Sequence, residues 1–298
     1  MNYVSVVQIA KEWAISERSV RNYCATGRVK GAYLEGKTWY IPKDATKPER
    51  INKKCDEPTS LLEILQDEKK RKYAGGIYHK TQIELTYNSN HMEGSRLTHD
   101  QTMYIFETNT IGTENEAVNV DDVIETVNHF RCIDMIIDNA NGVLTEKMIK
   151  ELHYTLKSGT SDSRLSWFAV GDYKKRANEV GGIVTALPTE VAGEMKKLLD
   201  EYNVKKEKSF EDILEFHVKF EKIHPFQDGN GRVGRLIMFK ECLKNKIVPF
   251  IIEDNLKMFY YRGLKEWNSE RGYLRDTCLS AQDKYKAYLN YFGISYKE

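Results

Sequence analysis

A polar stretch flanked by prolines divides this sequence into two unequal parts. Three of the six prolines, Pro42, Pro48 and Pro58, fall within seventeen residues, and the segment between the last two, ERINKKCDE, shows little apolar periodicity. Such a stretch buries no apolar face and predicts a linker. We therefore expect a small unit over residues 1–45, a linker over 46–59 and a larger unit over 60–298.

The two parts also differ in charge. Residues 1–54 hold 11 Lys and Arg against 5 Asp and Glu, a net charge of +6, whereas the remainder holds 34 against 39, a net charge of −5. This asymmetry suggests that the small unit meets a polyanion while the larger unit does something else. An ordinary basic surface is the alternative.

Several classes of protein are excluded. The longest apolar runs, such as residues 247–252, are far too short to span a membrane, and the N-terminus lacks the pattern of a signal peptide. The five cysteines are Cys24, Cys55, Cys132, Cys242 and Cys278. An odd and scattered set without a C-x-x-C pair argues against a disulfide framework or a zinc site, so we expect a cytoplasmic protein with no membrane segment.

The small unit is predicted to hold two short helices. Ser5 and Gln8 form a capping-box pattern before the first, and Ser16 precedes a second from Glu17 to about Ala25. The outward side of the second helix carries Arg18, Ser19, Arg21 and Asn22. Cations suit phosphates and forked donors suit base edges, so these four residues are candidate DNA contacts.

A small hairpin is expected next, over residues 29–42, with a turn at Glu35 and Gly36. The whole segment resembles the winged helix-turn-helix of the MerR and excisionase group, and this resemblance implies DNA binding through residues 1–45. The alternative is a helix-turn-helix that serves only folding or protein contact.

The larger unit is predicted to be mainly helical. Capping patterns at residues 60–63 and 98–101 open two helices, Asn119 suits the start of a third, and another should run from about residue 78 to 94. The helix after Asn119 is expected to bury Val120, Val123, Ile124 and Val127. Residues 179–188 combine β-branched residues with glycines, which predicts a short β-hairpin.

The most informative chemistry lies in residues 224–235, HPFQDGNGRVGR. Gly229 and Gly231 let the backbone approach a ligand closely, and the apolar pattern that resumes after them predicts that the loop leads into a helix. Free N–H groups at a helix N-terminus form an anion site. Arg232 and Arg235 add two guanidiniums on one side of the first turn, which favours a polyphosphate.

Two further residues of this loop suggest a reaction. Asp228 is its only carboxylate and would repel phosphates unless a cation lies between, for which Mg²⁺ is the natural choice. His224 titrates near neutrality and could accept a proton from an attacking hydroxyl. The glycine spacing matches neither a P-loop nor a dinucleotide-binding loop.

Residues 224–235 match the signature H-x-F-x-[DE]-G-N-G-R-x-x-R at every specified position, so the chain resembles the Fic family, over most of residues 75–290. The resemblance implies a mainly α fold, a helical core with a β-hairpin flap. It also implies transfer of AMP from ATP to a Ser, Thr or Tyr hydroxyl of a target protein.

The resemblance also implies roles for individual residues. His224 would be the general base, Asp228 would hold Mg²⁺ and Arg235 would engage the γ-phosphate. The other ATP phosphate contacts would come from Gly229, Asn230, Gly231 and Arg232. The flap, which would pair with an extended segment of the target, would contain Val180, Gly182, Ile183 and Val184.

A second motif lies N-terminal to this core. Ser89 and Glu93 in SNHMEG resemble the family's inhibitory motif [ST]-x-x-x-E-[GN]. The resemblance implies that Glu93 pairs with Arg235 and prevents a productive γ-phosphate pose. The alternatives are that Glu93 is merely a helix-end charge, or that it activates water to remove AMP from a modified target.

Weaker candidates complete the set. The family pattern suggests that Tyr260 and Tyr261 stack on adenine, although aromatics at helical spacing more often belong to a core. His217 and Glu221 are four apart and could ligate a metal, but no third ligand is evident and a solvated or capped helix face is expected.

We therefore expect a protein adenylyltransferase. The rival functions are a de-AMPylase that uses Glu93, and a DNA-binding regulator whose Fic core only senses a nucleotide. A homodimer would suit a palindromic DNA site.

Overall fold

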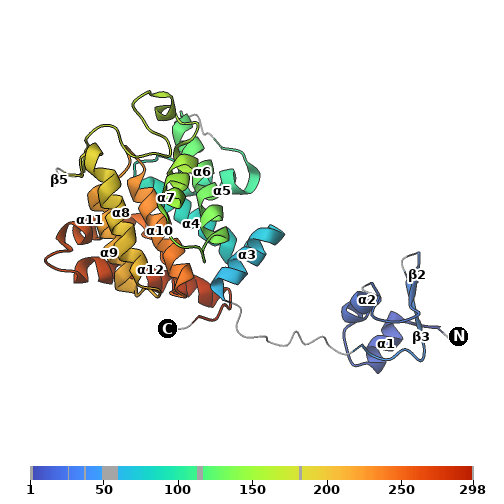
Figure 1. Cartoon of the computed structure of the whole chain (residues 1–298). Coiled ribbons are helices and arrows are strands. Elements are labelled where there is room, and N and C mark those ends of the chain that lie inside the picture. Colours follow the sequence, from blue (N-terminus) through green and yellow to red (C-terminus); the bar gives the residue numbers. More distant parts are fainter. Residues whose placement is uncertain are drawn as a thin grey trace. The chain divides into compact units, whose positions relative to one another are not determined.

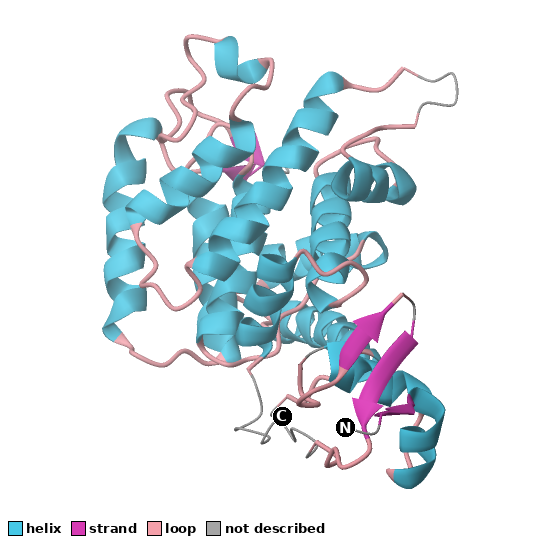
Figure 2. Ribbon diagram, turned by 90° about the vertical axis from the view of Figure 1, so that its right-hand side faces the viewer, coloured by secondary structure: helices cyan, strands magenta, loops and turns pink. Residues whose placement is uncertain are grey.

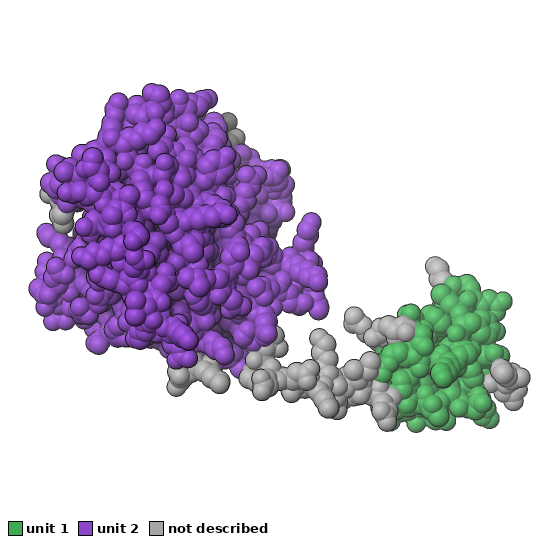
Figure 3. All heavy atoms as spheres, viewed as in Figure 1, with its two compact units in different colours: residues 1–58 green, residues 59–298 purple. Residues whose placement is uncertain are grey.

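The computed structural model describes residues 3–25, 27–36, 38–48, 60–112, 117–180 and 183–296; the side chains of Arg18, Asn22 and Ile183 lie outside the described part. The chain forms two compact units, Met1–Pro58 and Thr59–Glu298 (Figures 1 and 3). Most of the linker expected over residues 46–59, namely residues 49–59, falls outside the described residues.

The small unit combines two helices with a three-stranded sheet. Its elements are β1 (Tyr3–Ser5), α1 (Val6–Glu12), α2 (Glu17–Ala25), β2 (Tyr33–Glu35) and β3 (Thr38–Pro42). The antiparallel sheet has the order β1-β3-β2, with Leu34 opposite Trp39. The core contains the apolar faces of both helices, with Ile9, Val20 and Ile41 fully buried.

The larger unit is almost entirely helical (Figure 2). Its helices are α3 (Leu61–Arg71), α4 (Ile77–Met92), α5 (His99–Thr108), α6 (Val120–Asp138), α7 (Glu146–Lys157), α8 (Pro188–Val204), α9 (Phe210–Ile223), α10 (Asn230–Lys244), α11 (Lys257–Glu266) and α12 (Gly272–Tyr291), with 3₁₀ turns at Asp162–Arg164 and Asp254–Leu256. A short hairpin of β4 (Glu179–Val180) and β5 (Ile183–Val184) interrupts them. Among the described residues, no helix is both long and apolar enough to cross a membrane.

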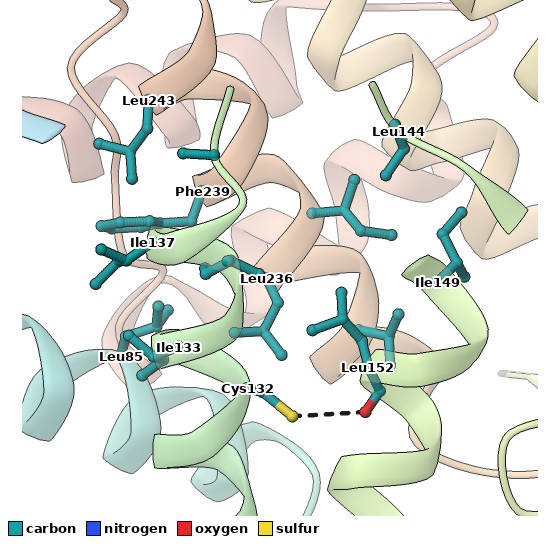
Figure 4. Packing of buried hydrophobic residues seen from close by; sticks show 14 of the residues in the cluster. Leu85, Cys132, Ile133, Ile137, Leu144, Ile149, Leu152, Leu236, Phe239 and Leu243 are labelled. Carbon is teal, nitrogen blue, oxygen red and sulfur yellow. Dashed lines mark hydrogen bonds between the residues drawn. The ribbon is translucent and has the colours of Figure 1, made fainter. Parts of the chain in front are cut away.

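Helix α10 lies at the centre of the larger unit. It contacts α4, α6, α7 and α9, and nearly all of its residues are buried. Figure 4 shows Leu236, Phe239 and Leu243 of α10 in the same apolar cluster as Ile133 of α6 and Leu152 of α7. Each such side chain stabilises the fold by about 1.5–3 kcal/mol on burial. This packing fixes the direction of α10 and therefore the position of its amino end.

Local signals in the sequence located most of these helices. The capping boxes of Ser5, Ser60 and Thr98 are present, and Asn119 caps α6. The prediction for Val120 was wrong: its side chain is 67% exposed, because the first turn of α6 extends beyond the packed part of the helix. Strand β1 was not expected, since three residues carry too little periodicity to be noticed.

Candidate active site

The loop between α9 and α10 has a fixed shape. His224 ends α9 in the left-handed conformation, with φ of 51°, and its N–H donates to Phe220 O at 2.9 Å. The side chain of Asn230 closes the loop, because it accepts from Phe226 N–H at 2.8 Å and donates to Phe226 O at 2.9 Å. Gly229 has φ of 82°, which favours glycine. The amide of Asn230, expected on a phosphate, therefore holds the loop's own backbone.

His153 of α7 supports the same loop. Its ring stacks on the fully buried Phe226, with centroids 3.9 Å apart and planes 3° apart. Its Nδ1 accepts from Gly171 N–H at 2.9 Å, so Nε2 carries the proton and donates to Asp228 O at 3.1 Å. Burial lowers the pKa of His153 to about 3, which keeps the ring neutral. His153 is a supporting residue that the sequence did not reveal.

Asp228 belongs to a network of charged side chains. Its Oδ2 accepts from Lys157 Nζ at 2.6 Å and from Arg232 Nη2 at 3.0 Å, and Glu125 pairs with both cations. Lys157 and Arg232 are 3% and 4% exposed, whereas Asp228 is 46% exposed. Burial acts to raise the pKa of Asp228, but Arg232 and Lys157 more than offset this and lower it well below its usual range. Asp228 is thus an ionised carboxylate that faces solvent.

The amino end of α10 offers free backbone donors. The first intrahelical bond joins Val233 N–H to Gly229 O at 3.0 Å, so the N–H groups of residues 230–232 lack helical partners. A β-carbon on Gly231 would lie 2.2 Å from Glu93 Oε1 and 2.9 Å from Arg235 Nη1. The absence of a side chain at Gly231 therefore leaves room for an anion, and the Glu93 carboxylate lies in that room.

Arg235 connects the end of α4 to α10. Its Nη2 donates to Glu93 Oε1 at 2.7 Å and to Ser89 O at 2.9 Å, and its Nε donates to Ser89 Oγ at 3.0 Å. Nη1 is buried and has no partner among the described residues. Burial acts to lower the pKa of Arg235, but the Glu93 carboxylate more than offsets it, so that its pKa is raised. The structure thus brings together Ser89, Glu93 and Arg235.

The His224 ring lies in a partly enclosed position, 14% exposed. Burial, and then the nearby Lys174 ammonium, lower the pKa of His224 to about 4, so the imidazole is neutral at pH 7. Lys174 itself is buried: its Nζ donates to Asn178 Oδ1 and to Thr185 Oγ1, both at 2.7 Å, and its N–H donates to Pro225 O at 2.9 Å. Lys174 therefore connects the root of the hairpin to the loop beside His224.

The hairpin itself exposes apolar side chains. Strands β4 and β5 pair antiparallel, with Glu179 opposite Val184. Val180 and Val184 are 42% and 70% exposed. Gly182 and the side chain of Ile183, which were expected in the flap, lie outside the described residues.

The two tyrosines suggested as adenine contacts differ in exposure. Tyr260 is 1% exposed and its hydroxyl bonds to His217 Nε2, so its ring has no free face for an adenine. Tyr261 is 38% exposed. We expected a solvated or capped helix face for His217 and Glu221, and the solvated face was wrong: His217 is fully buried and Glu221 is 15% exposed, because this side of α9 packs on Gly234 of α10.

The described residues hold no group of three or more His, Cys, Asp or Glu that could bind a metal alone. Mg²⁺ is usually held by one or two carboxylates together with substrate phosphates and waters. Asp228, ionised and half exposed beside the amino end of α10, fits that pattern of ligands.

The candidate DNA contacts lie in the small unit. Arg21 is 56% exposed and pairs with Glu17 at 3.1 Å, and Ser19 Oγ lies 2.9 Å from Ser16 Oγ. The backbone of Arg18 and Asn22 belongs to the same helix, α2.

Comparison with known proteins is consistent with this geometry. Residues 143–242 match the sequence model of the Fic/DOC family. The chain is 27% identical over 237 residues to the Protein adenylyltransferase Fic of Aedes aegypti, which covers 76% of this chain and 44% of that protein. The corresponding protein of Drosophila willistoni is 29% identical over 210 residues, 67% of this chain and 38% of that protein. The chain thus matches less than half the length of these relatives.

Solved structures give the same fold. A Fic domain containing signaling protein from Bacteroides thetaiotaomicron is 26% identical, with a TM-score of 0.58 over 77% of this chain and 90% of that one. Fic-1 from C. elegans is 17% identical, with a TM-score of 0.62 over 78% of this chain and 72% of that one.

Proposed function

We propose that this chain, whose residues 143–242 match the Fic/DOC family, is a protein adenylyltransferase that transfers AMP from ATP to a hydroxyl of a target protein. Curated relatives with this activity in their name match most of the chain at 25–29% identity. The names of these relatives support AMP transfer as the reaction, and the residues around α10 support the way in which it would be catalysed.

One observation carries the proposal: a carboxylate occupies an anion site at the amino end of α10. Glu93 Oε1 and Arg235 Nη1 both lie over Gly231, beside N–H groups without helical partners. A buried guanidinium nitrogen without a partner is costly, so its position suggests a ligand that completes its bonds. A nucleotide phosphate has the charge and the acceptor oxygens to do so.

The reaction follows from the residues beside this site. The target hydroxyl attacks the α-phosphorus, an O–P bond forms, and the bond to the bridging oxygen of the departing pyrophosphate breaks. The hydroxyl proton passes to His224, which is neutral at pH 7 because its pKa is lowered to about 4. Arg232 and the N–H groups of the first turn of α10 offset the charge that builds on the phosphate oxygens.

Asp228 would hold Mg²⁺, which would offset charge on the α- and β-phosphates. Lys157 and Arg232 keep this carboxylate ionised and orient it before any ligand arrives. Both cations donate their hydrogen bonds to the same oxygen of Asp228, Oδ2.

Glu93 would act as an inhibitor of this reaction. Its carboxylate accepts from Arg235 Nη2 and lies in the space over Gly231 that a γ-phosphate would need. The exposed hairpin β4–β5 would receive an extended segment of the target by strand addition. Val180 and Val184 are accessible for that contact.

The test uses ATP labelled at the α-phosphate, with Mg²⁺ and cell extract. Label should appear on protein with Glu93→Gly, and should disappear when His224→Ala is added. Labelling that does not depend on His224 would defeat this mechanism. Release of AMP from a modified target that requires Glu93 would instead identify de-AMPylation as the net reaction.

We also propose that the small unit binds DNA through α2. Its support is the net charge of +6 over residues 1–54 and the order of two helices followed by a hairpin. Binding should weaken as salt rises, and Arg18→Ala with Arg21→Ala should abolish it. Lys196→Ala, an exposed cation of the larger unit, is the control. Equal loss in the control would contradict a site on α2.

A further inference from the structure

Polar atoms without partners gather where α9 ends. His217 Nδ1, Glu221 Oε1 and His224 Nδ1 are all buried and have no hydrogen-bond partner among the described residues. Glu221 lies between the two histidines: its Oε1 is 3.9 Å from His217 Nε2 and its Oε2 is 3.9 Å from His224 Nδ1. Buried polar atoms in proteins are nearly always hydrogen-bonded, so three unpartnered ones together call for an explanation.

Gly234 of α10 makes room for this group. A β-carbon there would lie 2.7 Å from Glu221 Oε1 and 2.8 Å from His217 Nδ1. His224 ends α9 with a left-handed backbone, and its Nδ1 lies 3.9 Å from Oε2 of Glu221, the residue three positions earlier. The carboxyl group thus has a defined place behind the ring of the proposed base.

The charge state of Glu221 follows from its surroundings. Burial raises the pKa of Glu221 to about 8, Arg235 acts to lower it and Glu93 acts to raise it. The carboxyl is therefore protonated and neutral at pH 7. The charged groups that act on His224 are Lys174, Glu93 and Asp228. The main-chain carbonyl of Glu221 also acts on that ring.

We propose that Glu221 is a positioning residue for His224: its Oε2 accepts a hydrogen bond from Nδ1–H, which leaves Nε2 free to take the proton of the target hydroxyl. This assignment rests on the proposed function, in which His224 is the general base. The two atoms need to approach by about 1 Å to reach hydrogen-bond distance. Catalytic hydrogen bonds are often long before the substrate binds and shorten in the complex.

The neutral state of the carboxyl makes the proposal specific. A protonated carboxyl offers one acceptor oxygen, and a glutamine amide offers the same oxygen in the same place. Glu221→Gln should therefore rescue the bond to Nδ1, whereas Glu221→Met, of similar volume, removes the acceptor. Gly234→Ala is an independent perturbation, since its methyl group would displace the carboxyl.

The test reads the tautomer of the His224 ring. The full chain is labelled with ¹⁵N-histidine, and the His224 signals are assigned by their loss in His224→Gln. At pH 7 we expect the Nδ1–H form in the native chain and in Glu221→Gln, and a shift toward the Nε2–H form in Glu221→Met and in Gly234→Ala. Retention of the Nδ1–H form in both of the last two variants would overturn the proposal, because the main-chain carbonyl alone would then orient the ring.

A kinetic measurement accompanies the spectra. In the Glu93→Gly background, Glu221→Met should lower kcat for label transfer by about tenfold or more, with the ATP dissociation constant unchanged. Glu221→Gln should recover most of that loss; a loss equal to that of Glu221→Met would contradict the neutral acceptor. The measurement of the tautomer needs neither nucleotide nor target protein. If the tautomers shift as expected but no variant transfers label, the bond stands and the proposed function fails.

Discussion

Arg235 Nη2 donates both to Glu93 Oε1 at 2.7 Å and to Ser89 O at 2.9 Å, across more than 140 residues of sequence. The guanidinium is 4% exposed, whereas Glu93 is 26% exposed. The guanidinium is therefore shielded from solvent, and the carboxylate lies at the solvent side of the pair. In the proposed function, a nucleotide phosphate on Arg235 would take the place of this carboxylate.

The network around Asp228 should contribute to stability. Lys157→Met removes the buried cation that Asp228 and Glu125 share, and we expect the free energy of unfolding to fall by about 1–3 kcal/mol. Lys147 lies on the same helix and is 84% exposed, so Lys147→Met should change the free energy of unfolding by no more than about 0.5 kcal/mol. Urea unfolding followed by circular dichroism measures both. Equal effects would mean that the network does not stabilise the fold.

Asn230 should act as a structural residue of the loop. Asn230→Ala removes both hydrogen bonds to the Phe226 backbone and leaves a buried N–H unpaired, while Phe226 O keeps the bond that it accepts from Asn178 Nδ2 at 3.2 Å. We expect a loss of about 1–3 kcal/mol in the free energy of unfolding. Asn139→Ala, which removes an exposed amide bonded within its own helix, is the control for differential scanning calorimetry. A native-like melting temperature for Asn230→Ala would contradict this role.

Acid should destabilise the protein through its buried histidines. Burial lowers the pKa of His153 to about 3, against about 6.5 in an unfolded chain, so only the unfolded state takes up this proton as pH falls. The stability that the neutral His153 ring contributes is fully present above pH 6.5. It is lost as pH falls toward 3, at about 1.4 kcal/mol per pH unit.

Glu221 affects the free energy of unfolding in the opposite direction. Because its pKa is raised to about 8, the folded state alone holds this proton between about pH 4.3 and 8, and the stability that it contributes is lost as pH rises through that range. The comparison of His153→Gln with the native chain isolates one ring: the substitution should reduce the pH dependence of unfolding by about one proton between pH 6 and 4. An unchanged slope in His153→Gln would show that His153 binds its proton equally in both states.

The pH dependence of catalysis should reflect the lowered pKa of His224. A proton acceptor works only when deprotonated, and the pKa of His224 is lowered to about 4 by burial and then by Lys174. In Glu93→Gly, kcat/KM for label transfer should therefore hold down to about pH 5 and decline below it. Lys174→Met should move this decline to higher pH. A decline centred near pH 6.5 in the parent would indicate an exposed, unperturbed base.

Local patterns predicted a good part of this molecule. Capping boxes located three helix starts, and the spacing of the loop residues placed Gly229, Gly231 and Arg232 at the start of α10. These signals act over a few residues, so they are visible in the sequence. The pairing of Glu93 with Arg235, by contrast, was implied only by resemblance to a family.

The supporting residues could not be read from the sequence. Glu125 meets Arg232 across 107 residues, and Lys157 meets Asp228 across 71, so these contacts depend on how α6, α7 and α10 pack. The one local signal was the spacing of His153 and Lys157, four residues apart on one face of α7. Glu221 was misjudged for the same reason, because the glycine that makes room for it lies on another helix.

The central claim is that Glu93 occupies the position of a nucleotide phosphate on Arg235. Isothermal titration of ATP with Mg²⁺ into Glu93→Gly tests it most directly, with Glu93→Gly plus Arg235→Ala as the control. We predict at least about tenfold tighter binding than in the native chain, a gain that the second substitution removes. Equal affinity of the native chain and Glu93→Gly, or no magnesium-dependent uptake of ATP by either, would contradict the account.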